Sequence, residues 1–310
     1  MSVSEHEAPG MPPVRTVVVA YGDPEPLGRA LGALGHDDGV VVVDNSSSAA
    51  TRAVAEDAGA QYVDAGSNLG FAAAVNVALA RLPLDRCDVL LLNPDALVAP
   101  DVVEHLRRAL HAAPDVACAA PAQRRPGGER PSPVQWPFPT ATRAWAEAVG
   151  LGRAVRRQGY VIASVLLVRG DAWLDVGGFD EGFFLYAEEA DWERRAVRRG
   201  WRVAYCPEVT ALHVGAGTDP DPGRRHVRFH AGVETYMRKW HGAAGWHSYQ
   251  LATVVTAVRR AVVQRGRARR RAALELAHLY AAGPRRAARR AGVLPDRRHH
   301  VPAFETPAPS

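Results

Sequence analysis

The chain has 310 residues, of which 47% are hydrophobic, 23% charged and 7% aromatic. This composition is that of one large or two modest globular domains, and it excludes collagen-like and wholly disordered proteins. The net charge of +5 is uneven, because residues 251–300 hold 13 Arg against two acidic residues while the first 250 residues carry a net −5. Since the basic charge is not spread over the body of the chain, we expect no nucleic acid partner.

The cysteine content and the first residues indicate the compartment. Cys87, Cys118 and Cys206 lie far apart in the sequence and form no metal-like pair. An odd, sparse set of cysteines predicts a reducing compartment rather than a disulfide framework. Residues 1–13 are acidic and broken by proline, so we expect a disordered start and no signal peptide. No apolar stretch reaches the ~18 residues of a membrane span. We therefore expect a cytoplasmic protein.

The first half of the chain alternates short β-branched runs with helix-compatible segments. Strands are expected at 16–20, 40–44, 61–64 and 89–93, and helices near 25–35, 49–58, 71–82 and 100–113. Continuous apolar strands alternating with helices predict an α/β fold with a mostly parallel sheet covered on both faces. Residues 121–140 are rich in Pro, Gly and Arg and predict a break or mobile loop.

A second block of elements follows this break. A strand is expected over 160–168, a turn at Gly177-Gly178, a helix near 187–199 and a strand near 202–206. Residues 242–300 predict a basic, amphipathic helical tail, and residues 301–310 are expected to be disordered. The sequence contains no internal repeat.

Two acidic residues follow apolar strands at equivalent places. Asp44 closes the expected strand 40–44, and Asp95 follows the strand that ends at Asn93. In parallel sheets, ligands bind beyond the carboxyl ends of the strands, so both carboxylates are candidates for a binding site. The alternative is that they only cap helices or form turns.

An ordered set of motifs then narrows the function. The motifs are Val17–Tyr21, Val41–Ser47, Asn68–Asn76, Leu90–Asp95, Ala163–Arg169, Gly177–Asp191, Arg199–Trp201 and His213. Their order and spacing resemble the family 2 glycosyltransferases, in particular the rhamnosyltransferase-like branch, over residues 14–241. The resemblance implies a GT-A fold with a nucleotide-sugar half (about 14–120) and an acceptor or catalytic half (about 140–241). It also implies a nucleotide-diphosphate sugar donor, Mn²⁺ or Mg²⁺, and inversion at the anomeric carbon.

The resemblance assigns a metal site and a donor site. Asp95 and His213 would be the metal ligands; Asn93 stands where many members have a first Asp. The alternative for His213 is a satisfied, partly buried histidine. The donor-binding residues that the resemblance implies are Ala20, Tyr21, Asp44, Asn68, Gly70, Phe71, Asn76, Asn93 and Asp95. Asp44 would bind the nucleotide base, and Asn76 is either a donor contact or a buried polar group of its helix.

The acidic segment Tyr186–Asp191 would supply the base that takes the proton of the acceptor hydroxyl. The family usually shows Glu-Asp-x-Asp there, and Glu189 stands at the position of the base, one methylene longer than the usual Asp. Asp191 is the second candidate. The alternative is an acidic helix start that only favours the helix dipole.

Some positions depart from the family pattern. Gly22, Ala49 and Ala74 replace an Asn, an acid and a Gly that are common there. One rival interpretation is a non-catalytic nucleotide-sugar-binding protein that keeps the fold. A nicotinamide-dependent oxidoreductase would need a glycine-rich turn after the first strand. A nucleotide-sugar synthase would usually have a phosphate-loop lysine, and no lysine precedes Lys239.

The substrates and partners follow from the resemblance. A dTDP-, UDP- or GDP-sugar would be the donor, with dTDP-rhamnose first, and a glycan or lipid-linked acceptor in cell-envelope polysaccharide synthesis would receive the sugar. The tail adds a physical argument, because Leu251, Val254, Val255, Val258 and Val262 recur on one helical face beside arginines. We expect this face to bind an anionic membrane, the inner face of the plasma membrane; the alternative is a helix packed on the catalytic domain.

Overall fold

A computed structural model of the chain describes residues 11–35, 39–128, 131–152, 159–215 and 221–294. The expected disordered segment 301–310, and most of 1–13, lie outside the described residues. The chain divides into two compact units. The first unit comprises Met1–Pro139, Arg156–Phe183 and Ala187–Pro220, and the second comprises Thr140–Val155, Phe184–Tyr186 and Asp221–Ser310.

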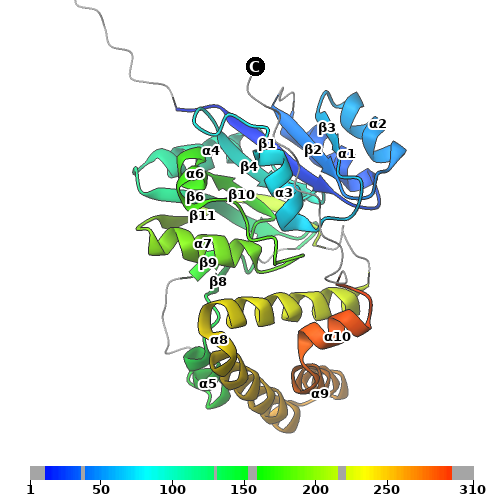
Figure 1. Ribbon diagram of the computed structural model, residues 1–310, viewed down its shortest axis with the longest axis vertical. Coiled ribbons are helices and arrows are strands. Elements are labelled where there is room, and N and C mark those ends of the chain that lie inside the picture. The colour runs from blue at the N-terminus through cyan, green and yellow to red at the C-terminus, as the bar shows by residue number, and fades with distance from the viewer. Residues whose placement is uncertain (1–10, 36–38, 129–130, 153–158, 216–220, 295–310) are drawn as a thin grey trace, which may run out of the picture. The chain divides into compact units, whose positions relative to one another are not determined.

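The first unit is built on a mixed sheet (Figure 1) with strand order β3-β2-β1-β4-β10-β6-β11-β5. The strands along this order are β3 (Gln61–Asp64), β2 (Val40–Asp44), β1 (Val14–Ala20), β4 (Asp88–Leu92), β10 (Val165–Val168), β6 (Val116–Arg124), β11 (Arg202–His213) and β5 (Ala96–Leu97). The strands β1 to β4 run parallel, as predicted, whereas β10 runs antiparallel to both of its neighbours. The two short strands β8 (Gln135–Pro137) and β9 (Gly159–Val161) form a separate pair, and β7 (Pro131–Ser132) pairs with β6.

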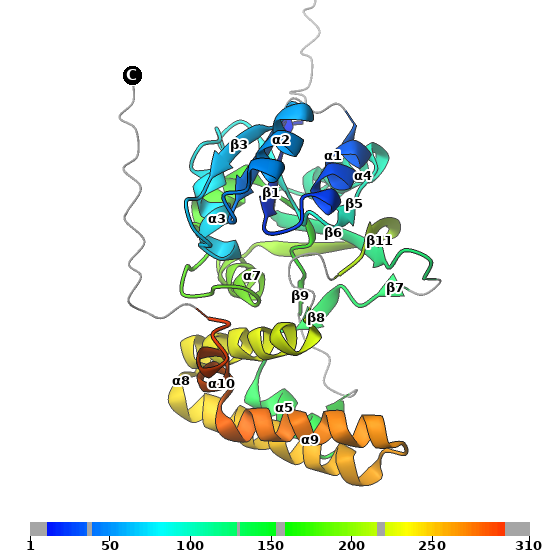
Figure 2. The ribbon, with the colours of Figure 1, turned by 90° about the vertical axis from the view of Figure 1, so that its right-hand side faces the viewer.

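Helices cover both faces of this sheet, because its central strands bury side chains on both sides. The helices of the first unit are α1 (Glu25–Leu34), α2 (Ala49–Asp57), α3 (Phe71–Leu79), α4 (Pro100–His111), α6 (Gly170–Val176) and α7 (Glu188–Arg198). One core packs α1, α2 and α4 against one face, and another packs α3, α6 and α7 against the opposite face. Figure 2 shows α1 and α4 on one side of the sheet and α3 and α7 on the other.

A buried arginine joins the middle of this sheet to α4. Arg169 follows β10 and donates from its guanidinium to the carbonyls of Val116, Leu110 and Ala113. The neighbouring His111 bonds Asp88 at 2.6 Å, so the cation lies in a closed polar network. Buried charges are tolerated when they are fully hydrogen-bonded, which explains why the apolar run of β10 ends at this residue.

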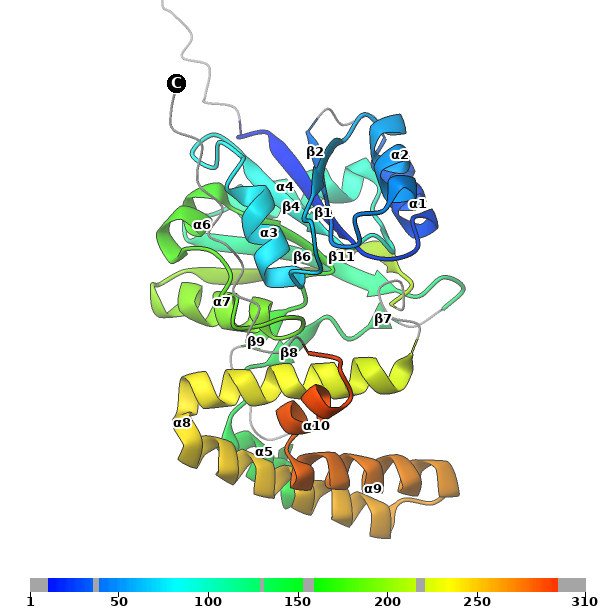
Figure 3. The ribbon, with the colours of Figure 1, turned by 45° about the vertical axis from the view of Figure 1, so that its right-hand side comes forward.

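The second unit is helical. Its helices are α5 (Ala141–Ala148), α8 (Pro222–Val263), α9 (Arg267–Ala282) and α10 (Pro284–Arg290). The long helix α8 bends at Gly242, which has a φ of 65°, and Figure 3 shows α9 alongside its second half. Trp246 and Tyr280 pack against each other between these two helices, with their rings tilted. Within the described residues, none of the helices combines the length and the apolarity that crossing a membrane requires.

Candidate active site

The end of β2 holds a buried, fully hydrogen-bonded carboxylate. Asp44 is 0% exposed. One of its oxygens accepts from the backbone N–H and the hydroxyl of Ser46 at 2.8 and 2.6 Å. The other accepts from the backbone of Ser48 at 2.7 Å and from the Tyr62 hydroxyl at 3.0 Å. Burial and the bond to Asp44 raise the pKa of Tyr62 to about 12, so the phenol remains a donor.

The segment before α3 is tied to the end of β2. Asn45 donates its amide to the carbonyl of Gly70 at 3.0 Å. Gly70 has a φ of +81°, a conformation that strains any residue with a Cβ, and its N–H is accepted by Asn68. Phe71 then begins α3. The segment that we predict to cradle the donor is therefore fixed in place by Asn45, a residue that the motif comparison did not single out.

Asn76 is a link between α3 and the turn before α7. Its amide nitrogen donates to the carbonyl of Phe179 at 2.9 Å and to Glu181 at 3.0 Å. Its oxygen accepts from the N–H of Phe179. Gly178 is required here, because a Cβ at that position would lie 2.7 Å from the Asn76 oxygen. Asn76 is half-buried, and these hydrogen bonds engage both the nitrogen and the oxygen of its amide; the donor contact stays a prediction.

Asp95 and His213 meet, although 118 residues separate their motifs in the sequence. An oxygen of Asp95 lies 3.2 Å from Nε2 of His213, and the other oxygen accepts from the N–H of Gly215 at 2.9 Å. The pairing of β11 with β5 sets this contact, since His213 is in register with Ala96. The Asn93 amide lies 3.4 Å from the same His213 nitrogen. The structure thus brings the two predicted metal ligands, Asp95 and His213, into contact and places Asn93 beside them.

The first two turns of α7 bury a set of acidic side chains, Glu188, Glu189, Asp191 and Glu193, which are all less than 9% exposed. In the described part of the chain, Glu188, Glu189 and Glu193 each have one buried carboxylate oxygen without a hydrogen-bond partner. Asp191 differs, because Arg195 donates to it at 3.1 Å. An acidic helix start that only complemented the helix dipole would face water, and these side chains do not.

Burial sets the protonation of these acids. Burial raises the pKa of Glu189 to about 7, although hydrogen bonds from the backbone at the start of α7 lower it. It raises the pKa of Glu188 well above its ordinary value, with a further rise from the charge of Glu189. Burial also raises the pKa of Glu193 well above its ordinary value, although Glu193 accepts a hydrogen bond from the N–H of Val161 at 2.9 Å. The pKa of Glu189 therefore lies near neutral pH, where both of its protonation states are populated.

The backbone that enters α7 is strained. Ala187, at the N-cap of α7, has a φ of 72° and lies in the left-handed region. A non-glycine residue there costs on the order of 1 kcal/mol, and such residues concentrate at functional sites. Ala187 lies directly before Glu188 and Glu189. A destabilising backbone conformation therefore sets the direction in which these carboxyl groups point.

Two further polar residues lie beside the Asn93 end of β4 and were not among the predicted site residues. Ser164 accepts the N–H of Asn93 with its carbonyl and donates its hydroxyl to Gln123 at 2.9 Å. Gln123 is 1% exposed, and its amide nitrogen has no hydrogen-bond partner in the described structure. No sequence feature points to Gln123, because residues 121–140 are predicted to be a break or mobile loop, whereas β6 continues to Arg124.

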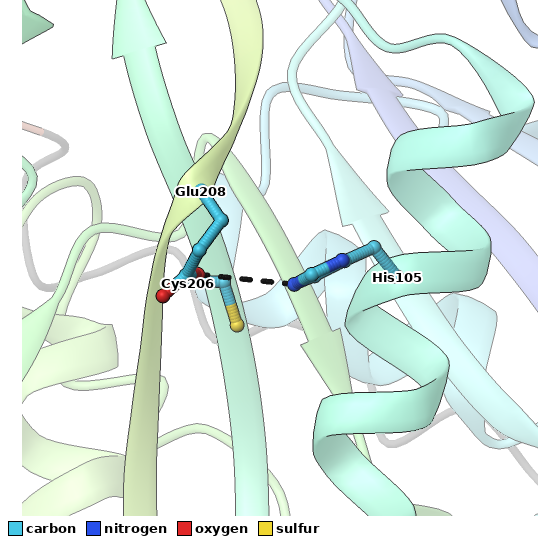
Figure 4. Close-up of side chains that lie close together, drawn as sticks. All are labelled: His105, Cys206 and Glu208. Carbon is cyan, nitrogen blue, oxygen red and sulfur yellow. Dashed lines mark ion pairs between the residues drawn. The ribbon is translucent and has the colours of Figure 1, made fainter.

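A separate group of potential metal ligands lies on the α4 face. His105, Cys206 and Glu208 place their ligand atoms within 4.8 Å of one another (Figure 4). The figure shows His105 on α4 pointing to Glu208 on β11, and this pair is 3.8 Å apart. Burial raises the pKa of the Cys206 thiol, which disfavours the thiolate that a metal would need. None of the predicted site residues belongs to this group.

Comparisons with known sequences place these features in a family. The model of the family described as "Glycosyl transferase family 2" matches residues 16–158. That described as "Glycosyl transferase family group 2" matches residues 89–281, more than half of the chain. The N-acetylglucosaminyl-diphospho-decaprenol L-rhamnosyltransferase of Mycobacterium tuberculosis is 29% identical over 67% of this chain and 76% of its own length. The rhamnosyltransferase WbbL of Escherichia coli is 26% identical over 64% of this chain and 83% of its own length.

Solved structures show the same fold. The mannosyltransferase PcManGT of Pyrobaculum calidifontis, solved with GDP-Man and Mn²⁺, matches 92% of this chain and 80% of its own with a TM-score of 0.58 at 16% identity. Glucosyl-3-phosphoglycerate synthase of Mycobacterium tuberculosis matches 74% of this chain and 80% of its own with a TM-score of 0.53 at 16% identity. The expected GT-A fold is confirmed. The chain belongs to the family 2 glycosyltransferases, in their rhamnosyltransferase-like branch.

Proposed function

We propose that this glycosyltransferase moves a sugar, rhamnose first, from a nucleotide-diphosphate donor to a hydroxyl of a glycan or lipid-linked acceptor, with inversion and with Mn²⁺ or Mg²⁺. The observation that carries the proposal is the buried Glu189 carboxyl at the start of α7, with a pKa of about 7 and an oxygen that has no hydrogen-bond partner among the described residues. The Asp95–His213 pair of the same unit supports the metal dependence.

The donor atoms at β4 and β11 fit a divalent cation. Two ligands at right angles on a cation with bonds of about 2.1 Å are about 3 Å apart, and the Asp95 oxygen lies 3.2 Å from the His213 nitrogen. One carboxylate and one imidazole leave further positions for diphosphate oxygens and water. A bound cation would neutralise the charge that develops on the leaving diphosphate. PcManGT, which shares the fold, was solved with Mn²⁺.

The donor pocket is proposed to lie at the ends of β1, β2 and β4. β1 ends at Ala20, and the backbone of Ala20 and of the following Tyr21 would line this pocket, while Asn68, Gly70 and Phe71 would form its wall. For Asp44 to bind the nucleotide base, one of its four present hydrogen-bond donors must move away. The Tyr62 hydroxyl is the donor with the freest geometry, because the others belong to the Ser46–Ser48 turn.

Glu189 is proposed as the base. The acceptor oxygen attacks the anomeric carbon from the face opposite the diphosphate, its new C–O bond forms as the C–O bond to the diphosphate breaks, and its proton passes to Glu189. A base with a pKa near the working pH is the most effective one, because it is partly ionised and still basic. Asp191 is less suited, since Arg195 holds its carboxylate in an ion pair.

The choice of sugar and acceptor is supported by the relatives. Two of them are named rhamnosyltransferases, and the mycobacterial one is named for a polyprenyl-diphosphate-linked N-acetylglucosamine acceptor. We therefore place dTDP-rhamnose before UDP- and GDP-sugars as donor, and a lipid-linked glycan before a free one as acceptor. A role in cell-envelope polysaccharide synthesis follows from that acceptor class.

A donor screen tests the proposal. Full-length protein is melted with dTDP-rhamnose, UDP-sugars and GDP-sugars, with and without Mn²⁺, and sugar transfer to a lipid-linked acceptor is followed by mass spectrometry. We expect one donor class to raise Tm only with the metal, since ligands stabilise the state that they bind. Asp95→Ala should lose this metal-dependent shift, while the exposed control Asp57→Ala keeps it. A metal-dependent Tm shift without any transfer or donor hydrolysis would favour the non-catalytic binding protein instead.

A further inference from the structure

The hairpin of α8 and α9 in the second unit exposes apolar side chains that a folded protein normally covers. Leu251, Val255, Val258 and Val262 are 55%, 39%, 46% and 73% exposed. They recur at intervals of four, three and four residues, so they share an arc of about 60° on the helix surface. Val263, at the last position of α8, is also exposed. We call these five side chains the apolar stripe.

The rest of α8 explains why the stripe is left uncovered. Ala252, Thr256 and Ala257 are buried and lie on the other side of the same helical turns. The second helix of the hairpin, α9, contributes to this covered side, because its Ala273, Leu279 and Tyr280 are buried. The core of the second unit is therefore complete without the apolar stripe.

Positive charge lies at one end of the stripe. Arg260, Arg265 and Arg267 are exposed around the hairpin tip, where α8 ends at Val263 and α9 begins. No acidic residue occurs between Glu234 and Glu275. The first turn of α9 carries arginines and no acid, and its N-cap provides no side-chain hydrogen bond. Cations at a helix N-terminus oppose the helix dipole, so the arrangement is unfavourable within the helix itself.

We infer that the apolar stripe and its arginines form a docking surface for an anionic lipid bilayer. A bilayer accepts apolar side chains below the headgroups while arginines reach the phosphates, which meets both features at once. A second copy of the chain is a poorer occupant, because a two-fold contact would place these arginines against each other. The inference concerns the surface alone and does not depend on the proposed transfer reaction.

Vesicle binding tests the inference without any donor or acceptor. The full chain is co-sedimented with phosphatidylglycerol/phosphatidylcholine vesicles and with pure phosphatidylcholine vesicles at rising salt. We expect binding to the anionic vesicles that salt weakens, and little binding to the neutral ones. Val258→Asp/Val262→Asp should reduce the partition coefficient at least tenfold. The control Leu174→Asp, an equally exposed apolar residue on α6, should leave it unchanged.

A charge variant keeps the test independent of the apolar substitutions. Each basic residue near an anionic surface is worth about a fivefold change in binding, so Arg260→Gln/Arg265→Gln/Arg267→Gln should bind about 100-fold more weakly at low salt. Arg29→Gln/Arg86→Gln/Arg108→Gln lowers the net charge equally on exposed residues of the first unit and should bind like the wild type. Equal binding of both charge variants, or no binding to anionic vesicles, overturns the inference. A dimer in sedimentation velocity that Val258→Asp/Val262→Asp dissociates, with no vesicle binding, would identify a second copy as the occupant.

Discussion

The end of β2 and the start of α7 both bury carboxyl groups, and they treat them in opposite ways. Asp44 has four donors for its two oxygens and organises the turn around it. Glu189 has one oxygen without a partner and a pKa raised to about 7. A satisfied carboxylate stabilises the fold and is chemically quiet, whereas an under-satisfied one costs stability and is available to take a proton. The comparison assigns structure to the first region and chemistry to the second.

The largest effect should follow from removing the proposed base. Glu189→Gln is nearly isosteric and cannot accept the proton, so kcat should fall by about 10²–10⁴-fold. Donor affinity, measured by calorimetry, should stay within about twofold. Asp191→Asn is the matched variant in the same helix turn, and its main expected effect is on stability because it breaks the pair with Arg195. Normal turnover of Glu189→Gln together with an inactive Asp191→Asn would exchange their roles.

At the end of β2 we expect a substitution to lower the free energy of unfolding rather than kcat. Asp44→Ala leaves buried donors such as the Tyr62 hydroxyl without an acceptor, so the free energy of unfolding should fall by about 3 kcal/mol. Urea denaturation measures it, with the exposed Asp57→Ala as control. Glu188→Gln, in the other region, should lower stability less than Asp44→Ala does, because burial and the charge of Glu189 raise the pKa of the native carboxyl and so favour its neutral form. If Glu188→Gln lowered the free energy of unfolding as much as Asp44→Ala does, the two regions would not differ in the way proposed.

The pH dependence of stability sharpens the comparison. Glu193 has a folded-state pKa raised well above its value of about 4.5 in the unfolded chain. Its contribution to stability is therefore complete at low pH and is lost as the pH rises above that unfolded value, by up to about 1.4 kcal/mol per pH unit. Glu193→Gln stays neutral and still offers an oxygen to Val161. From pH 5 to 8 the variant should lose less stability than the wild type, measured by urea unfolding; identical slopes would mean that Glu193 ionises normally.

A smaller effect is expected at the link between α3 and the turn before α7. Asn76→Ala removes the hydrogen bonds to Phe179 and Glu181, and the free energy of unfolding should fall by about 1–2 kcal/mol. Asn68→Ala, which loses a bond within its own turn, should cost less than half as much. Equal losses in thermal unfolding would show that Asn76 does not join the two segments.

The apolar pattern predicted the parallel part of the sheet, and long-range pairing decided the rest. Strands β1, β2 and β4 lie where continuous apolar runs predict them, because strands buried on both faces need such runs. The expected strand 160–168 is divided, since Val161 pairs with β8 and Val165–Val168 pairs with β4 and β6. The last strand runs to His213 rather than to 206, because it pairs with β6 and then β5.

The motifs predicted which residues belong to the candidate site, and the structure added contacts and buried groups that the motifs do not contain. The contact of Asp95 with His213 is as predicted, since both residues belong to motifs that the family order places at the site. The saturation of Asp44 was not predictable, because it depends on Tyr62 from the next strand. Glu193 was missed, because an acid on a helix is typical of a solvated face, and only the packing of α7 reveals its burial.

The central claim is that Glu189 is a base poised near neutral pH, and the pH dependence of kcat tests it most directly. With donor and acceptor saturating and metal in excess, kcat should rise with pH along an acid limb centred near pH 7, since only the ionised carboxylate accepts the proton. The limb should disappear from the residual activity of Glu189→Gln and persist in Glu193→Gln. A limb near pH 4, the value of an ordinary carboxyl, or an unchanged limb in Glu189→Gln, would contradict the account.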